Sequence, residues 1–242
     1  MVGSGPAIQM AAGAAGAAAA LAVVHAAPGL TALAPVKLGL FPALAGLGRP
    51  DHVALTFDDG PDPATTPAFL DLLAARGVQA TFFLLGEMVE KAPSLAAEIS
   101  AAGHEIAVHG FHHRWTLLRG PRSVWDDLSR ARDVIACATG AEPRWYRPPH
   151  GVLSSAALAA ARCLHLVPIL WSSWGREWRP RATPRAVYET AAAGLSGGGT
   201  VLLHDSDCAS PAGAAHAALG ALPMLLDDCD RAGLRVGTLA CH

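Results

Sequence analysis

The sequence predicts an α/β fold, a distorted (β/α) barrel of about seven units that forms a single domain. From residue 52 onward, short apolar runs typical of strands alternate with longer segments that have helical spacing. The number of strand-like runs favours a closed or partly closed barrel over an open sheet. The length of 242 residues also suits an α/β barrel with one core.

The elements are expected in strict alternation along the chain. Strands are expected at residues 52–57, 80–85, 105–109, 144–147, 166–171, 200–204 and 235–239. Helices are expected between them, at residues 65–76, 94–102, 123–139, 154–162, 184–194 and 211–232. Glycines at positions 77, 103 and 140 are helix stop signals, and Thr183 is a candidate cap before Pro184.

Residues 1–50 are predicted to be a leader or membrane-associated segment, separate from a catalytic domain at residues 51–242. No Asp, Glu, Lys or Arg occurs before Lys37, and residues 10–34 are apolar and rich in Ala. Such a stretch is typical of a signal peptide or a single membrane span, which favours a membrane-associated or extracytoplasmic location. The stretch has no basic region before it, and Ala inserts less readily than Leu. A helix packed on the domain, a disordered leader and a cytoplasmic location therefore stay open.

Charge and cysteine content exclude some classes of partner and site. The formal net charge is -2 and the isoelectric point is about 6.6, so no basic surface for nucleic acid is expected. None of the five cysteines lies in a Cys-x-x-Cys pair, which argues against a thiolate zinc site. The sequence does not predict an oligomeric state.

Polar residues cluster where predicted strands end. In barrels of this kind, the active site lies at the carboxyl ends of the strands. Five separate strands end in such residues, which are Asp58 with Asp59, His109 to His113, Arg147, the segment from Trp171 onward, and His204. We therefore expect these side chains to converge on one rim of the barrel.

A metal site is expected among these residues. His109 and His113 are four residues apart, a spacing that lets both imidazoles bind one metal, with His112 as a competing candidate. Asp59 is the expected third ligand, and this donor set suits Zn best, with Co or Ni possible. Each motif alone has a simpler explanation, since Asp-Asp-Gly-Pro is a good turn sequence and histidine pairs in loops are often solvated.

Proton transfer groups are expected beside the metal. Arg147 is held rigidly by the prolines that follow it, and its natural use is to fix the carboxylate of Asp58. His204 ends a strand and is a candidate proton donor to a leaving group. Glu177 could orient His204 and raise its pKa, and tryptophans such as Trp171 and Trp178 could form a pocket wall or belong to the core.

Five motifs in order resemble the polysaccharide deacetylases of carbohydrate esterase family four. They are Thr-Phe-Asp-Asp-Gly, His-x-x-x-His, Arg-Pro-Pro-x-Gly, a Trp-rich loop and Leu-Leu-His, spread over roughly residues 52–240. The resemblance implies that Asp58 is the general base and His204 the general acid. It implies that Arg147 positions the base and that Glu177 positions the acid. It also implies three metal ligands, which are Asp59, His109 and His113. It also implies an acyl pocket that includes Leu202 and an oxyanion contact from the backbone N–H of His150.

The resemblance implies a metal-dependent hydrolase that removes acetyl groups from N-acetylated amino sugars of a polysaccharide, either peptidoglycan or a chitin-like polymer. An acetylated glycan is thus the expected partner. Three positions depart from the family pattern, Gly110, His150 and Trp174, and these leave the substrate open. The alternatives are an O-acetyl glycan esterase or small-amide hydrolase with the same metal centre, and a non-catalytic carbohydrate-binding protein of the cell envelope.

Overall fold

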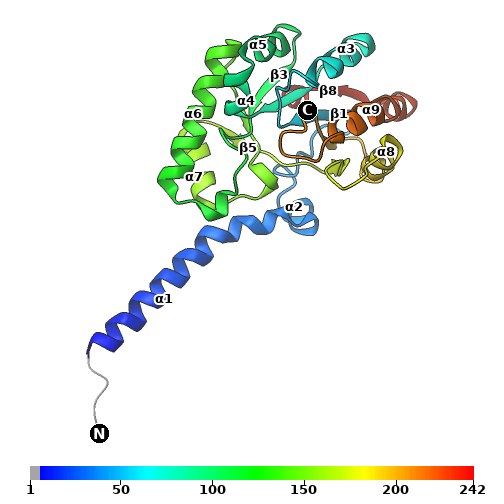
Figure 1. Cartoon of the computed structure of the whole chain (residues 1–242). Coiled ribbons are helices and arrows are strands. Elements are labelled where there is room, and N and C mark those ends of the chain that lie inside the picture. The colour runs from blue at the N-terminus through cyan, green and yellow to red at the C-terminus, as the bar shows by residue number, and fades with distance from the viewer. Residues whose placement is uncertain (1–5) are drawn as a thin grey trace.

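A sheet of eight parallel strands lies at the centre of the computed structural model, which describes residues 6–242 and their side chains from residue 15 (Figure 1). The strands are β1 (His52–Asp58), β2 (Thr81–Leu84), β3 (Glu105–Val108), β4 (Trp145–Tyr146), β5 (Val167–Pro168), β6 (Ser173–Trp174), β7 (Thr200–His204) and β8 (Arg235–Gly237). Their order is β5-β4-β3-β2-β1-β7-β6, and β8 pairs with β1. Because β5 and β6 form the two ends of this order, the barrel is open on one side.

Helices surround the sheet and cover its outer face (Figure 1). They are α3 (Thr66–Arg76), α4 (Gly86–Lys91), α5 (Pro93–Ala101), α6 (Pro121–Thr139), α7 (Ser155–Cys163), α8 (Pro184–Ala192) and α9 (Ala214–Arg231). Short 3-10 turns lie at Thr116–Leu118, Pro149–Gly151 and Leu239–Cys241. The predicted distorted α/β barrel in a single domain is confirmed.

The alternation of side chains along each strand separates two cores. Odd-numbered residues of β1, such as Leu55 and Phe57, point outward into the large cluster under the helices. Ala54 of β1 and Phe83 of β2 point into the barrel and form a smaller interior cluster. Even-numbered positions of β1 and β7 therefore face the interior, where polar side chains need defined partners.

Two parts of the fold differ from the sequence-based expectation. Helix α4 was not predicted, and the strand expected at residues 166–171 is only the two-residue β5, followed by the unpredicted β6. The chain leaves the sheet after β5 because the Leu170 N–H donates to the carbonyl of Leu44 (2.7 Å) instead of to a neighbouring strand. The N-terminal segment thus takes the place of a strand partner at the open side.

The N-terminal segment has two parts with different surroundings. Helix α1 (Pro6–Ala26) extends away from the barrel, and its side chains from residue 15 onward are almost all exposed (Figure 1). The window Ala15–Ala32 is long and apolar enough to cross a membrane by length and composition. The 3-10 turn η1 (Ala27–Ala32) and helix α2 (Ala34–Leu40) then lead back onto the barrel, where Gly29 lies against Leu153.

Candidate active site

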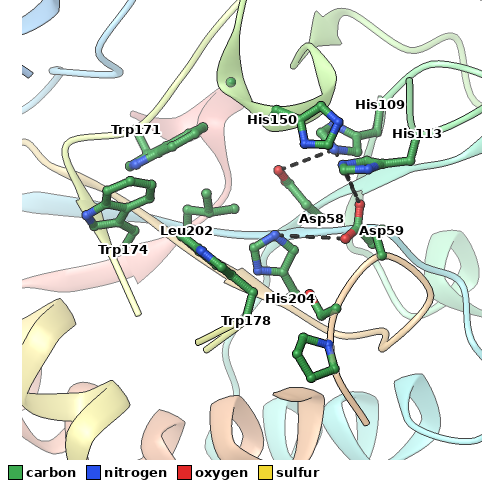
Figure 2. Close-up of a pocket in the computed structure, with 14 residues that line it drawn as sticks. Asp58, Asp59, His109, His113, His150, Trp171, Trp174, Trp178, Leu202 and His204 are labelled. Atoms are coloured by element: carbon green, nitrogen blue, oxygen red, sulfur yellow. Dashed lines mark ion pairs between the residues drawn. The ribbon is translucent and has the colours of Figure 1, made fainter. Parts of the chain in front are cut away.

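The carboxyl ends of three strands bring Asp58, His109 and His204 together inside the barrel. Asp58 pairs in register with His204 of β7, and the N–H of His109 donates to the carbonyl of Leu84 (2.9 Å). Asp59 follows β1 with a φ of 80°, a left-handed conformation that is costly for a residue with a side chain. This turn lets the carboxylates of Asp58 and Asp59 reach the same cavity (Figure 2).

Asp59, His109 and His113 form a compact cluster of metal-ligating atoms. Asp59 Oδ1 lies 3.4 Å from His109 Nε2 and 3.6 Å from His113 Nε2, and one ligand atom from each residue lies within 4.8 Å of the others. His109 Nδ1 donates to the carbonyl of Arg147 (2.8 Å), so the lone pair of Nε2 faces the carboxylate. An outer hydrogen bond of this kind commonly orients a metal-binding imidazole.

The protonation chemistry of the cluster fits a divalent cation. Asp59 Oδ1 is buried and has no hydrogen-bond partner among the described residues. Burial raises the pKa of Asp59 to about 7, and the neighbouring Asp58 adds to this, although His204 opposes it. Burial lowers the pKa of His113 to about 3 and that of His109 well below its usual value, so both rings are neutral. Two neutral imidazoles and one carboxylate oxygen that has no hydrogen-bond partner among the described residues are a suitable donor set for Zn or a related metal.

His112, the competing candidate, lies outside the cluster. Its Nδ1 is 3.4 Å from Glu87 Oε2, and its ring packs edge-on against Phe111. The structure therefore brings together Asp59, His109 and His113 and leaves His112 on the other side of the loop.

Arg147 holds one oxygen of Asp58. Its Nη1 donates to Asp58 Oδ1 (2.7 Å) and to Thr56 Oγ1 (2.8 Å), and its Nη2 donates to the carbonyl of Leu170 (2.8 Å). The guanidinium is fully buried and stacks over the ring of Phe83. Asp58 Oδ2 is free of this contact and lies 3.8 Å from Nε2 of a cluster histidine, His109. One oxygen of Asp58 is thus fixed while the other faces the cluster.

Glu177 holds His204 from the opposite side. Glu177 Oε1 lies 2.9 Å from His204 Nδ1 and also accepts from the backbone N–H of the same histidine (2.6 Å). Burial alone would lower the pKa of His204, but the Glu177 carboxylate, with Asp59 and Asp58, raises it to about 10. His204 is therefore an imidazolium at neutral pH, with Nε2 directed toward Asp59 (3.9 Å).

These groups lie at one end of a cavity of about 310 Å³ (Figure 2). Its wall includes four residues singled out in the sequence, His150, Trp171, Trp178 and Leu202. Arg147 and Glu177 do not line the cavity and instead lie behind Asp58 and His204.

Trp174, one of the three positions that depart from the family pattern, also lines the cavity, whereas Gly110 does not. Four further lining residues were not expected from the sequence, namely Gly151, Ala209, Ser210 and Pro211. The segment at 209–211 has small or apolar side chains that suggest no chemistry, so only the folding of the β7–α9 connection over the cavity reveals it.

The chain is similar in sequence to known proteins. The polysaccharide deacetylase family profile matches residues 46–169. A chitooligosaccharide deacetylase from Bradyrhizobium is 38% identical over 154 residues, which cover 63% of this chain and 70% of that protein. A peptidoglycan-N-acetylglucosamine deacetylase from Bacillus cereus is 33% identical over 155 residues, which cover 63% of this chain and 72% of that protein.

A solved structure supports the fold. A carbohydrate esterase family four pseudoenzyme from Bacillus anthracis superposes with a TM-score of 0.72 at 24% identity, and the match covers 80% of this chain and 66% of that chain. At this identity the likeness speaks for the barrel alone. The family profile and the sequence relatives, together with a family four carbohydrate esterase from Streptomyces lividans that superposes with a TM-score of 0.70 at 29% identity, show that the chain belongs to the polysaccharide deacetylase family, carbohydrate esterase family four.

Proposed function

We propose that this protein removes acetyl groups from N-acetylated amino sugars of a glycan, such as peptidoglycan or a chitin-like polymer. The observation that carries the proposal is the buried cluster of Asp59, His109 and His113, with Asp58 and His204 beside it on one cavity. Relatives that act on chitooligosaccharide and on peptidoglycan N-acetylglucosamine support this substrate class.

Three residues of this chain would hold the metal, namely Asp59, His109 and His113. A bound divalent ion, with Zn the best fit and Co or Ni acceptable, would supply Lewis-acid activation of water and of the acetyl carbonyl. The neutral state of both imidazoles suits this task, because a protonated ring cannot coordinate a metal.

Asp58 and His204 would move the protons. Asp58 accepts a proton from the attacking water through Oδ2, the oxygen that Arg147 does not hold. The imidazolium of His204 donates from Nε2 to the leaving nitrogen, which departs as the amine of the sugar. Glu177 keeps the His204 ring oriented and charged, so acid and base begin the reaction in opposite protonation states.

The cavity wall would select the acyl group and position it. Leu202 and the neighbouring tryptophans present an apolar surface to the cavity, which suits the methyl of an acetyl group. The backbone N–H of His150 would stabilise the oxyanion that forms during attack. His150 itself has a φ of 61°, and its ring stacks on Trp115 with 4.1 Å between centroids.

Acetate release from N-acetylglucosamine oligomers tests the proposal. We expect release that needs added Zn or Co and that falls at least about 100-fold in Asp58→Asn. Asp71→Asn, which changes an exposed aspartate of α3, should behave as the wild type. A panel of O-acetylated glycans and small amides run in parallel separates the esterase and small-amide alternatives. No release from any acetylated substrate, with metal bound, would contradict the deacetylase function and favour a binding protein.

Helix α1 would attach the protein to a membrane. Its apolar side chains from residue 15 onward lie exposed, including Leu21 and Val23 at 71% and 68% exposure, although the end of the helix contacts α7. Such a surface is unfavourable in water and favourable in a bilayer. The full chain should float with liposomes in a density gradient, whereas a chain lacking residues 1–26 should stay at the bottom. Equal behaviour of the two proteins would argue against the anchor.

A further inference from the structure

A row of cations and tryptophans forms the back of one cavity wall. Lys37 Nζ lies 4.3 Å from the ring centroid of Trp171, which lies 5.2 Å from the ring of Trp174. Arg176 lies over the other side of the row, with its Cζ 4.3 Å from the ring of Trp174. Both tryptophans line the cavity, whereas neither cation does. A third cation, Arg147, lies with its Cζ 5.7 Å from the centroid of the Trp171 ring, so three positive charges lie against this pair of tryptophans.

Lys37 does not belong to the barrel strands or to their connections. It comes from α2, in the N-terminal segment, and is only 4% exposed. Lysine is rarely buried without an acidic partner, yet Lys37 forms no ion pair with any described residue. Burial, with repulsion from Arg147, lowers its pKa to about 8, so the ammonium form still predominates at neutral pH. The face of the Trp171 ring is the group that receives this charge.

Contacts after α2 fix Lys37 at this place. The carbonyl of Leu44 accepts from the N–H of Leu170, the residue before Trp171 (2.7 Å). Two residues later, the carbonyl of Gly46 accepts from Thr200 Oγ1 (2.7 Å). Gly46 has a φ of 69°, and a Cβ there would lie 2.4 Å from Thr200 Oγ1, so the segment sits tightly on the barrel.

We infer that Lys37 is a positioning residue that sets the orientation of Trp171 and thereby the affinity of the cavity for its substrate. The outer edge of the Trp171 ring also has little freedom, since a Cβ at Gly151 would lie 2.3 Å from ring atom Cη2. Lys37 at the ring face and Gly151 at the ring edge therefore both restrict the position of the ring. The inference rests on the proposed function for the nature of the substrate, an N-acetylated glycan.

Steady-state kinetics of Lys37→Met test the inference. Met is as long as the apolar stem of the lysine side chain and removes the charged ammonium group. We expect KM for an N-acetylglucosamine oligomer to rise about tenfold, with kcat changed less than about twofold, because a wall contact acts on substrate binding and not on the chemical step. Metal content should stay at the wild-type value. Arg49→Met is the matched control, because Arg49 is a cation of the same region that is exposed and pairs with Asp51.

A double-mutant cycle separates positioning through Trp171 from a general structural role. If Lys37 acts through that ring, Lys37→Met should raise KM in the wild type and have no further effect in Trp171→Leu. An equal rise in both backgrounds, or no rise in either, overturns the inference.

A spectroscopic measurement keeps the inference testable without any activity. In protein labelled with 5-fluorotryptophan, the fluorine resonance of Trp171 is assigned by its loss in Trp171→Leu. Lys37→Met should shift the Trp171 resonance and leave that of Trp145, on β4, in place. Unchanged resonances overturn the inference. A shift in a protein that hydrolyses no acetylated glycan would instead refute the proposed function while the structural role of Lys37 stands.

Discussion

Replacement of Arg147 by Met removes the countercharge of Asp58 from the barrel interior. Arg147 is fully buried and Asp58 is 2% exposed, and the two are joined at 2.7 Å. Met can fill most of the same space and cover the ring of Phe83, but it cannot donate to Asp58, to Thr56 or to the carbonyl of Leu170. The carboxylate then stays buried without its main partner.

The cost follows from the burial of the pair. Removal of one partner from a buried, hydrogen-bonded ion pair destabilises a protein by about 3–5 kcal/mol, because the remaining charge is uncompensated. An exposed pair is worth only about 0–1 kcal/mol. Arg122→Met, which breaks an exposed pair with Asp126 on α6, is therefore the control. Small domains have only about 5–15 kcal/mol of stability, so Arg147→Met should remain folded in the cold with a strongly lowered melting temperature.

Urea unfolding of the metal-free protein measures the loss of unfolding free energy in Arg147→Met. A double-mutant cycle with Asp58→Asn shows whether that loss comes from the contact with Asp58. Asn cannot carry the charge that Arg147 compensates, so Arg147→Met should cost about 1–3 kcal/mol less in the Asp58→Asn background than in the wild type. If the cost is the same in both backgrounds, Arg147 acts only by packing and the assignment of its role to Asp58 is refuted.

Three further predictions concern the metal, the acid and the buried lysine. His113→Ala should weaken metal binding more than about 100-fold by isothermal titration, whereas His112→Ala should leave it unchanged. Glu177→Gln removes the charge that raises the pKa of His204, so the alkaline limb of the pH–rate profile should move to lower pH. The lowering of the Lys37 pKa from 10.5 to about 8 corresponds to a loss of roughly 3 kcal/mol of unfolding free energy below pH 8. The unfolded state binds more protons between these pH values, so the unfolding free energy of the wild type should rise from pH 8 to 10.5 relative to that of Lys37→Met.

Each of these predictions has a contradicting result. Equal metal affinities of the two histidine variants would remove His113 from the ligand set. A pH–rate profile that does not move in Glu177→Gln would mean that Glu177 does not control the charge of His204. Parallel stability curves of wild type and Lys37→Met across the alkaline range would mean that Lys37 is solvated or already neutral in the folded protein.

The sequence predicted the parts of the fold that depend on local pattern. Alternating apolar residues and helix stop signals located the barrel strands and most helices, because each is set by the residues of that segment itself. The shortness of β5 was not predictable, since it depends on the contact of Leu170 with Leu44, far away in the sequence. For the same reason, nothing in the pattern around Lys37 indicated that it reaches the ring of Trp171.

One part of the candidate site could likewise be predicted from the sequence, and another part could not. Strand ends predicted that Asp58, His109 and His204 converge, because the carboxyl ends of parallel strands share one edge of the barrel. The choice between His112 and His113 needed the path of the loop after β3, in which His113 turns toward the carboxylates and its neighbour turns away.

The most direct test of the central claim is the stoichiometry of the products from a defined N-acetylglucosamine oligomer. The metal-loaded protein should release acetate and generate free sugar amine in equal amounts, and both should disappear together in Asp58→Asn. Acetate without new amine from a glycan that also carries O-acetyl groups would identify an esterase instead. Neither product from the oligomer, with metal bound at the cluster of Asp59, His109 and His113, would contradict the proposed deacetylase function.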